Sequence, residues 1–66
     1  MKKVKWMCEL ERGDMILIHN DDPMDHVCRR CKIVEVHVDH LIAKDMSDPD
    51  IRLWIDNDFM DRVYWA

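Results

Sequence analysis

Short runs rich in apolar, β-favouring side chains recur along this chain, and turn-forming residues separate them. Five runs show this pattern, at residues 15–19, 32–38, 41–44, 51–55 and 62–65, and in 34–38 and 51–55 every second residue is apolar and expected to face inward. Alternation with a period of two is typical of β-strands that bury one face. Five short strands at this spacing predict an all-β fold, in the form of a small closed barrel or a rolled-up sheet.

The N-terminal segment also alternates. Over residues 3–9, Val4, Trp6 and Cys8 share one face of an extended chain, so we expect a sixth strand there. The following turn contains Gly13, the only glycine in the chain, which is suited to a positive φ.

In the second half, the alternation assigns the apolar side chains to a core. The expected inward residues are Val34, Val36, Val38, Ile51, Leu53, Ile55, Val63 and Trp65. Trp54 and Tyr64 then lie on the opposite face. Residues 56–60 predict one short helical turn, with Asp56 or Asn57 as its N-cap and Phe59 in the core.

The order of these parts resembles an SH3-like barrel over residues 10–65. The resemblance lies in the Gly13-Asp14 entry, the long loop at residues 20–30, the central hairpin, the helical turn and the last strand. It is a resemblance of architecture and rests on no diagnostic motif. It implies a module that binds proteins or nucleic acids, because barrels of this kind are seldom complete enzymes.

Composition sets the class of protein. The 66 residues are 48% hydrophobic and 36% charged, as expected for one folded domain, and no apolar run reaches the roughly 20 residues that span a membrane. The basic start is not followed by the apolar segment of a signal peptide, so we expect a cytoplasmic protein. The net charge of −4 arises within residues 39–66, which disfavours long-range attraction to nucleic acid.

A metal-binding pattern occurs in the long loop. His26, Cys28 and Cys31 could supply three ligands to a structural Zn²⁺, with Cys8, His19 or Asp25 as a fourth. The alternatives are that the cysteines pack as small apolar residues, or that Arg29, Arg30 and Lys32 lower the pKa of a reactive thiol.

No catalytic site is expected. The chain has no threonine, its one serine is Ser47 in a turn, and no nucleophile is paired with a base. His37 and His40 are expected to be solvated surface residues. Six aspartates form either a negative docking face or a solvated, solubilising surface: Asp45, Asp48, Asp50, Asp56, Asp58 and Asp61. Turn and cap chemistry, rather than a calcium loop, is expected for the pairs Asp48/Asp50 and Asp56/Asp58.

The expected binding face carries the unassigned aromatic side chains. Its residues are Trp54, Tyr64, Arg52, Arg62, Asp56 and Asp58. Exposed aromatic rings beside arginines are typical of protein interfaces. The sequence therefore predicts a non-catalytic, acidic protein that acts by protein–protein contact, as a bacterial or bacteriophage regulator or inhibitor of a larger host protein, with homodimerisation as a corollary.

Two alternatives remain open. In the first, a barrel binds single-stranded nucleic acid: Trp54 and Tyr64 stack on bases, and the phosphates are met by Arg29, Arg30, Lys32, Arg52 and Arg62. In the second, zinc stabilises an interaction domain.

Overall fold

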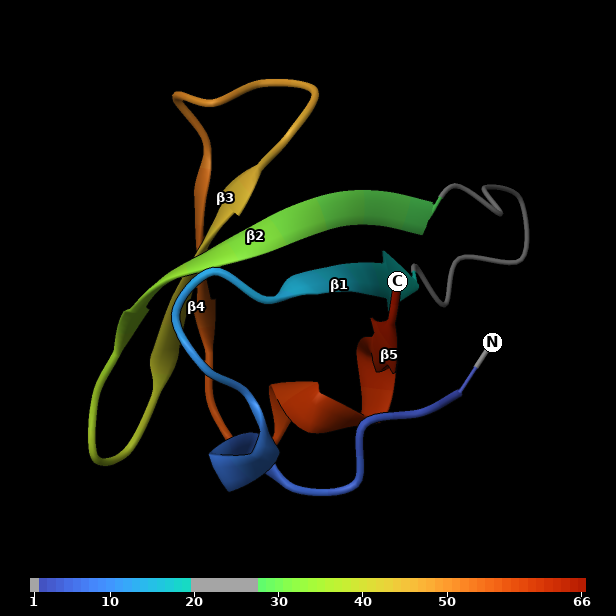
Figure 1. Ribbon diagram of the computed structural model, residues 1–66, viewed down its shortest axis with the longest axis vertical. Helices are drawn as coiled ribbons and strands as arrows, with labels where there is room; N and C mark the ends of the chain where they lie inside the picture. Colours follow the sequence, from blue (N-terminus) through green and yellow to red (C-terminus); the bar gives the residue numbers. More distant parts are fainter. Residues whose placement is uncertain (1, 20–27) are drawn as a thin grey trace.

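The chain folds around one five-stranded antiparallel sheet (Figure 1). The computed structural model describes residues 2–19 and 28–66. The strands are β1 (Met15–His19), β2 (Cys28–Val36), β3 (Leu41–Asp45), β4 (Arg52–Ile55) and β5 (Val63–Trp65). Two 3-10 helices, η1 (Met7–Glu9) and η2 (Phe59–Arg62), precede β1 and β5. The prediction of an all-β fold with a short helical turn before the last strand is therefore confirmed.

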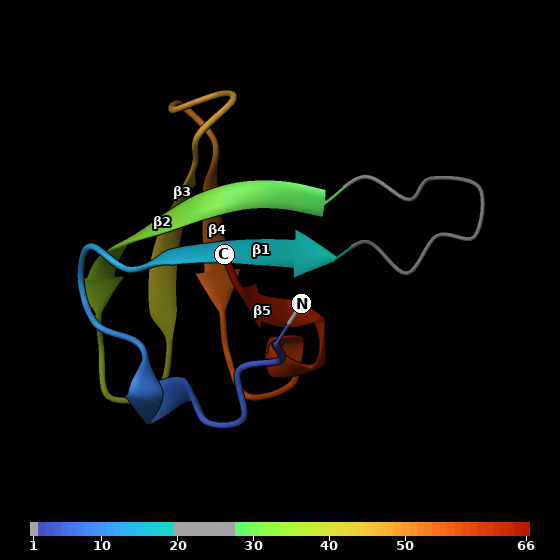
Figure 2. The ribbon, with the colours of Figure 1, turned by 45° about the vertical axis from the view of Figure 1, so that its right-hand side comes forward.

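Strand β2 joins the two halves of the sheet. Its residues 28–32 pair with β1 and its residues 31–36 pair with β3. Figures 1 and 2 show β2 curving between them, so that β1 crosses β3 and β4 at a steep angle. The strand order is β4-β3-β2-β1-β5, and no pairing between β4 and β5 closes the described part of the sheet. The structure thus shows a curled five-stranded sheet.

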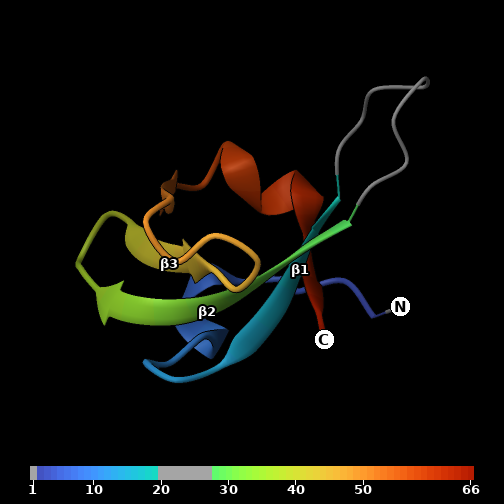
Figure 3. The same cartoon turned by 90° about the horizontal axis from the view of Figure 1, so that it is seen from above.

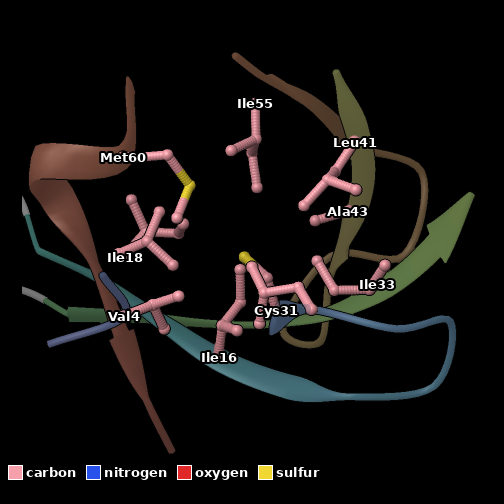
Figure 4. Packing of buried hydrophobic residues seen from close by; sticks show 11 residues of the cluster. Val4, Ile16, Ile18, Cys31, Ile33, Leu41, Ala43, Ile55 and Met60 are labelled. Atoms are coloured by element: carbon pink, nitrogen blue, oxygen red, sulfur yellow. The ribbon is translucent and has the colours of Figure 1, made fainter. Parts of the chain in front are cut away.

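The concave side of the sheet holds the core. Figure 4 shows Ile55 and Met60 facing Ile16, Ile18 and Cys31 across the interior. The view from above in Figure 3 places η2 on the far side of the molecule from β2, so the chain encloses these side chains between them. The buried apolar residues are Val4, Leu10, Ile16, Ile18, Cys31, Ile33, Leu41, Ala43, Ile55, Met60 and Val63. Phe59 and Trp65 are partly buried against this core.

The predicted sixth strand is wrong. In the segment before β1, only Lys3 forms a β-bridge, with Tyr64, and the chain then turns into η1. The amide of Glu9 donates to the carbonyl of Trp6, which replaces pairing to another strand. Val4 is buried, as predicted, whereas Trp6 is 65% exposed and Cys8 is also exposed. The segment covers the core through Val4 and Leu10.

A β-bulge in β2 changes which side chains are buried. The register with β3 shifts between Ile33 and Glu35, so Val34 is an extra residue in the pairing. Cys31 and Ile33 fill the inward positions that precede the bulge. Val36 lies opposite the buried Leu41 but is 51% exposed, and Val38 in the hairpin turn is fully exposed. The predicted burial of Val36 and Val38 is therefore wrong. Ile51, at 36% exposed, also lies outside the core.

Candidate functional site

Three aromatic rings stack at the end of the β2–β3 hairpin. The amide of His37 donates to the carbonyl of His40, which closes the turn and brings the two imidazoles together. Their centroids lie 4.4 Å apart with 14° between the planes. The imidazole of His40 in turn lies against the indole of Trp54, at 3.5 Å and 8°. The prediction that His40 is solvated is wrong, because its side chain is only 13% exposed.

Carboxylates border this stack. Oδ1 of Asp39 lies 2.6 Å from Nδ1 of His40, and this hydrogen bond is the main reason that the pKa of Asp39 is below its ordinary value. Oε1 of Glu35 lies 3.5 Å from Nε2 of His37. The bond from Asp39 holds the plane of the His40 ring, and so fixes the surface against which Trp54 rests.

An apolar pocket adjoins the stack. It has a volume of about 240 Å³ and is lined by Met7, Cys8, Leu10, Val36, His37, Val38 and Leu41. His37 belongs to both the pocket and the stack, so the two features are continuous. We call this region the hairpin surface, and define it as the exposed residues Val36, His37, Val38 and Trp54 together with His40, which supports Trp54. It combines two exposed aliphatic side chains with an indole that is 58% exposed.

The structure separates the two aromatic residues of the predicted binding face. Trp54 lies on β4 and Tyr64 on β5, at opposite ends of the strand order. Tyr64 is half-buried, and its ring meets that of His19 edge-on with centroids 6.2 Å apart. Arg52 remains beside Trp54, because residues two apart on a strand share one face.

The other predicted binding residues lie around η2. The guanidinium carbon of Arg62 lies 5.9 Å from the centroid of the Phe59 ring. Asp56 is half-buried, and its Oδ1 accepts a hydrogen bond from the amide of Phe59 at 3.1 Å, as predicted for a residue that caps the helical turn. Asp58 is exposed at the start of η2 and makes no side-chain capping bond.

The predicted acidic face does not include all six aspartates. Asp45 is buried, forms an ion pair with Arg29 at 3.0 Å, and accepts a hydrogen bond from the amide of Ser47. The bond from Ser47 is the largest cause of its lowered pKa. Asp48 and Asp56 accept hydrogen bonds within turns, and Asp61 lies 3.5 Å from Lys3. Turn and cap chemistry is therefore confirmed for Asp48 and Asp56, for which it was predicted, and it also applies to Asp45.

The cysteines of the predicted zinc pattern lie on one continuous strand. Cys28 and Cys31 both belong to β2, and an odd spacing directs their side chains to opposite faces. Cys31 is fully buried, and burial raises the pKa of its thiol to about 11. The reactive-thiol prediction is therefore wrong for Cys31. His26 and Asp25 lie outside the described residues, and residues 2–19 and 28–66 contain no group of three metal-ligand side chains.

Sequence reasoning missed most of the hairpin surface. The alternation predicts Val36 and Val38 in the core and His40 in the solvent, and these predictions are wrong, whereas His37 is exposed as predicted. One local signal was present, because Ile33 and Val34 are adjacent apolar residues that interrupt the alternation at the bulge. The stacking of His40 on Trp54 has no such signal, since it joins a residue of the β2–β3 turn to one on β4.

Comparison with known proteins identifies no family for this chain. No family model, curated protein or solved structure matches the chain. Within the described ranges, no helix is long and apolar enough to cross a membrane.

Proposed function

We propose that this protein is a non-catalytic binding module that contacts a protein partner through the hairpin surface. The observation that carries the proposal is Trp54, an indole that is 58% exposed and yet held in place by the ring of His40. A ring fixed before binding loses little conformational entropy on association, which makes such residues strong interface anchors.

The residues around Trp54 favour contact with an apolar side chain of the partner. Val38 is fully exposed, Val36 is half-exposed, and both line the pocket of about 240 Å³ beside the stack. Exposed aliphatic side chains around a pocket mark protein interaction sites on soluble domains. The partner in this proposal inserts an apolar side chain between η1 and the hairpin, and packs a second one on Trp54.

The proposal extends to fold and role. The strand order, the β2–β3 hairpin and the 3-10 turn before β5 agree with an SH3-like barrel, a fold commonly used for binding. In this proposal the chain is a bacterial or bacteriophage protein. It acts in the bacterial cytoplasm and regulates or inhibits a larger protein there. A second copy of the chain is the alternative occupant of the hairpin surface.

Affinity capture from the host cell with matched variants tests this proposal. Trp54→Ala and Val38→Asp should each lose a co-purifying protein that the wild-type chain retains. Trp6→Ala is the control, because Trp6 is also exposed but lines neither the pocket nor the stack. Sedimentation of the same variants separates self-association from a foreign partner. An identical set of captured proteins for wild type and both hairpin variants would contradict the proposal.

A further inference from the structure

Three cationic side chains lie side by side across the sheet. Lys32 on β2 is the register partner of Lys44 on β3, and Lys44 is the partner of Arg52 on β4. Each of the three is next in sequence to a residue that faces the core, so all three lie on the outer face of the sheet. The Cα atoms of register partners lie about 5 Å apart, so the Cα atoms of the three residues span about 10 Å. We call Lys32, Lys44 and Arg52 the cation row.

The described residues place no ion-pair partner beside this row. Among the described residues, no carboxylate oxygen lies within 4.0 Å of any of the three cations. Like charges placed directly opposite each other on neighbouring strands destabilise a sheet. Lys44 has such a neighbour on both sides, so the arrangement is unfavourable for folding and favourable for an anion.

The row continues at both ends. At the β2 end, the amide of Gly13 donates to the carbonyl of Ile33, and this bond brings Arg12 beside a pocket of about 370 Å³. Lys32, Lys44, Gly13, Ile33 and Val34 form the other walls of the pocket. At the β4 end, Trp54 shares the outer face with Arg52, and its ring is 58% exposed.

We propose that the cation row binds the phosphodiester backbone of a single-stranded nucleic acid, with an unpaired base stacked on Trp54. The charge row fits a ligand that repeats its negative charge along a chain. The exposed ring at its end favours unpaired bases, since a duplex keeps its base faces covered. The net charge of −4 opposes long-range attraction, so binding depends on these local contacts. The site goes beyond the proposed protein contact and shares only Trp54 with it.

Fluorescence anisotropy with a labelled oligothymidylate, titrated over a range of salt concentrations, tests the proposal. Three phosphate contacts predict a slope of about −2 for the logarithm of affinity against the logarithm of salt. Lys44→Glu should weaken binding by about tenfold or more, because it removes one contact and repels phosphate. Trp54→Ala should weaken binding with an unchanged slope, because stacking releases no counterions.

Two controls separate this site from general effects of charge and folding. Lys5→Glu makes the same change in net charge outside the row and should leave the affinity close to that of the wild type. The thermal midpoint of Lys44→Glu should not fall, because a carboxylate between Lys32 and Arg52 would form opposite-charge pairs with both. If this variant unfolds, Lys44→Gln provides the same measurement without charge reversal.

Several outcomes overturn the proposal. The first is absence of oligonucleotide binding at the lowest salt concentration. The second is that Lys5→Glu and Lys44→Glu weaken oligonucleotide binding equally. The third is displacement of the oligonucleotide by polyglutamate of matched charge, which would identify an acidic protein as the ligand. Val38→Asp should leave oligonucleotide binding intact, so its behaviour distinguishes failure here from failure of the protein-contact proposal.

Discussion

The imidazole of His40 lies nearly parallel to the indole of Trp54, with ring centroids 3.5 Å apart and 8° between the planes. The contact joins the β2–β3 turn to β4, and it leaves the indole 58% exposed. One face of the ring is therefore fixed by the fold, while the rest is presented to solvent. A binding function for this part of the molecule depends on that combination of order and exposure.

Removal of the His40 ring should loosen Trp54. His40→Ala is expected to lower the free energy of unfolding by about 0.5–1.5 kcal/mol, as for other aromatic pairs. In a background in which Trp6 and Trp65 are replaced by Phe, time-resolved anisotropy of Trp54 should show greater local motion. His37→Ala, which removes only the outer ring of the stack, should have a smaller effect. Equal motion of Trp54 with and without His40 would show that β4 alone fixes the indole.

Asp45 should make folding sensitive to acid. Its pKa in the folded chain is lowered, mainly by the hydrogen bond from Ser47, so the carboxylate stabilises the fold at pH values above the ordinary carboxyl range. This contribution should disappear as the pH falls through the lower, folded-state pKa. Asp45→Asn should therefore be less stable than the wild type at neutral pH, and the difference should shrink below about pH 4.

Urea unfolding of both proteins between neutral and strongly acidic pH measures this difference. Asp58→Asn is the matched control, because Asp58 is exposed and makes no capping bond. A difference between wild type and Asp45→Asn that does not change with pH would rule out the assigned role of the carboxylate.

Gly13 should resist substitution for a backbone reason alone. Its φ is +99°, and a Cβ atom at this position would meet no atom within 4 Å. Gly13→Ala should therefore lower the free energy of unfolding by about 1–2 kcal/mol through strain in the turn, without any steric clash. Gly13→Asn should cost less, because Asn adopts positive φ more readily. If the two variants unfold at the same denaturant concentration as the wild type, this turn is not strained.

The cysteines should differ in reactivity. Cys8 is exposed, whereas Cys31 is fully buried and burial raises the pKa of its thiol to about 11. Brief alkylation of the native protein followed by mass spectrometry should label Cys8 and leave Cys31 unmodified until denaturant is added. Rapid native labelling of Cys31 would contradict its position in the core. Stoichiometric zinc in protein purified without chelator would support the predicted site at His26, Cys28 and Cys31.

The strands could be predicted because each requires only a local pattern. Residues 15–19 form an apolar run behind a turn, and the structure has β1 over the same five residues. The exposure of Trp54 also follows from the alternation around Ile55. The start of β2 was missed, because residues 28–30 are polar and become a strand by pairing with β1. The N-terminal segment alternates equally well, but it bonds to β5 at Lys2 and Val4 and then turns into η1.

The candidate sites depend on positions that are distant in sequence. The bulge at Val34 cannot be placed without the pairing of β2 with β3, and the exposure of Val36 and Val38 follows from their place at the turn end of that hairpin. Side-chain alternation predicts that Tyr64 and Trp54 share one face, whereas the strand order places them at opposite ends of the sheet.

By itself, then, the sequence determined an all-β chain, five of its strands and an outward Trp54, because side-chain alternation and turn residues act over a few positions. Only the tertiary structure decided that His40 supports Trp54 and that Lys32, Lys44 and Arg52 align. Strand register sets both relationships, and register is fixed by how the whole sheet pairs and packs.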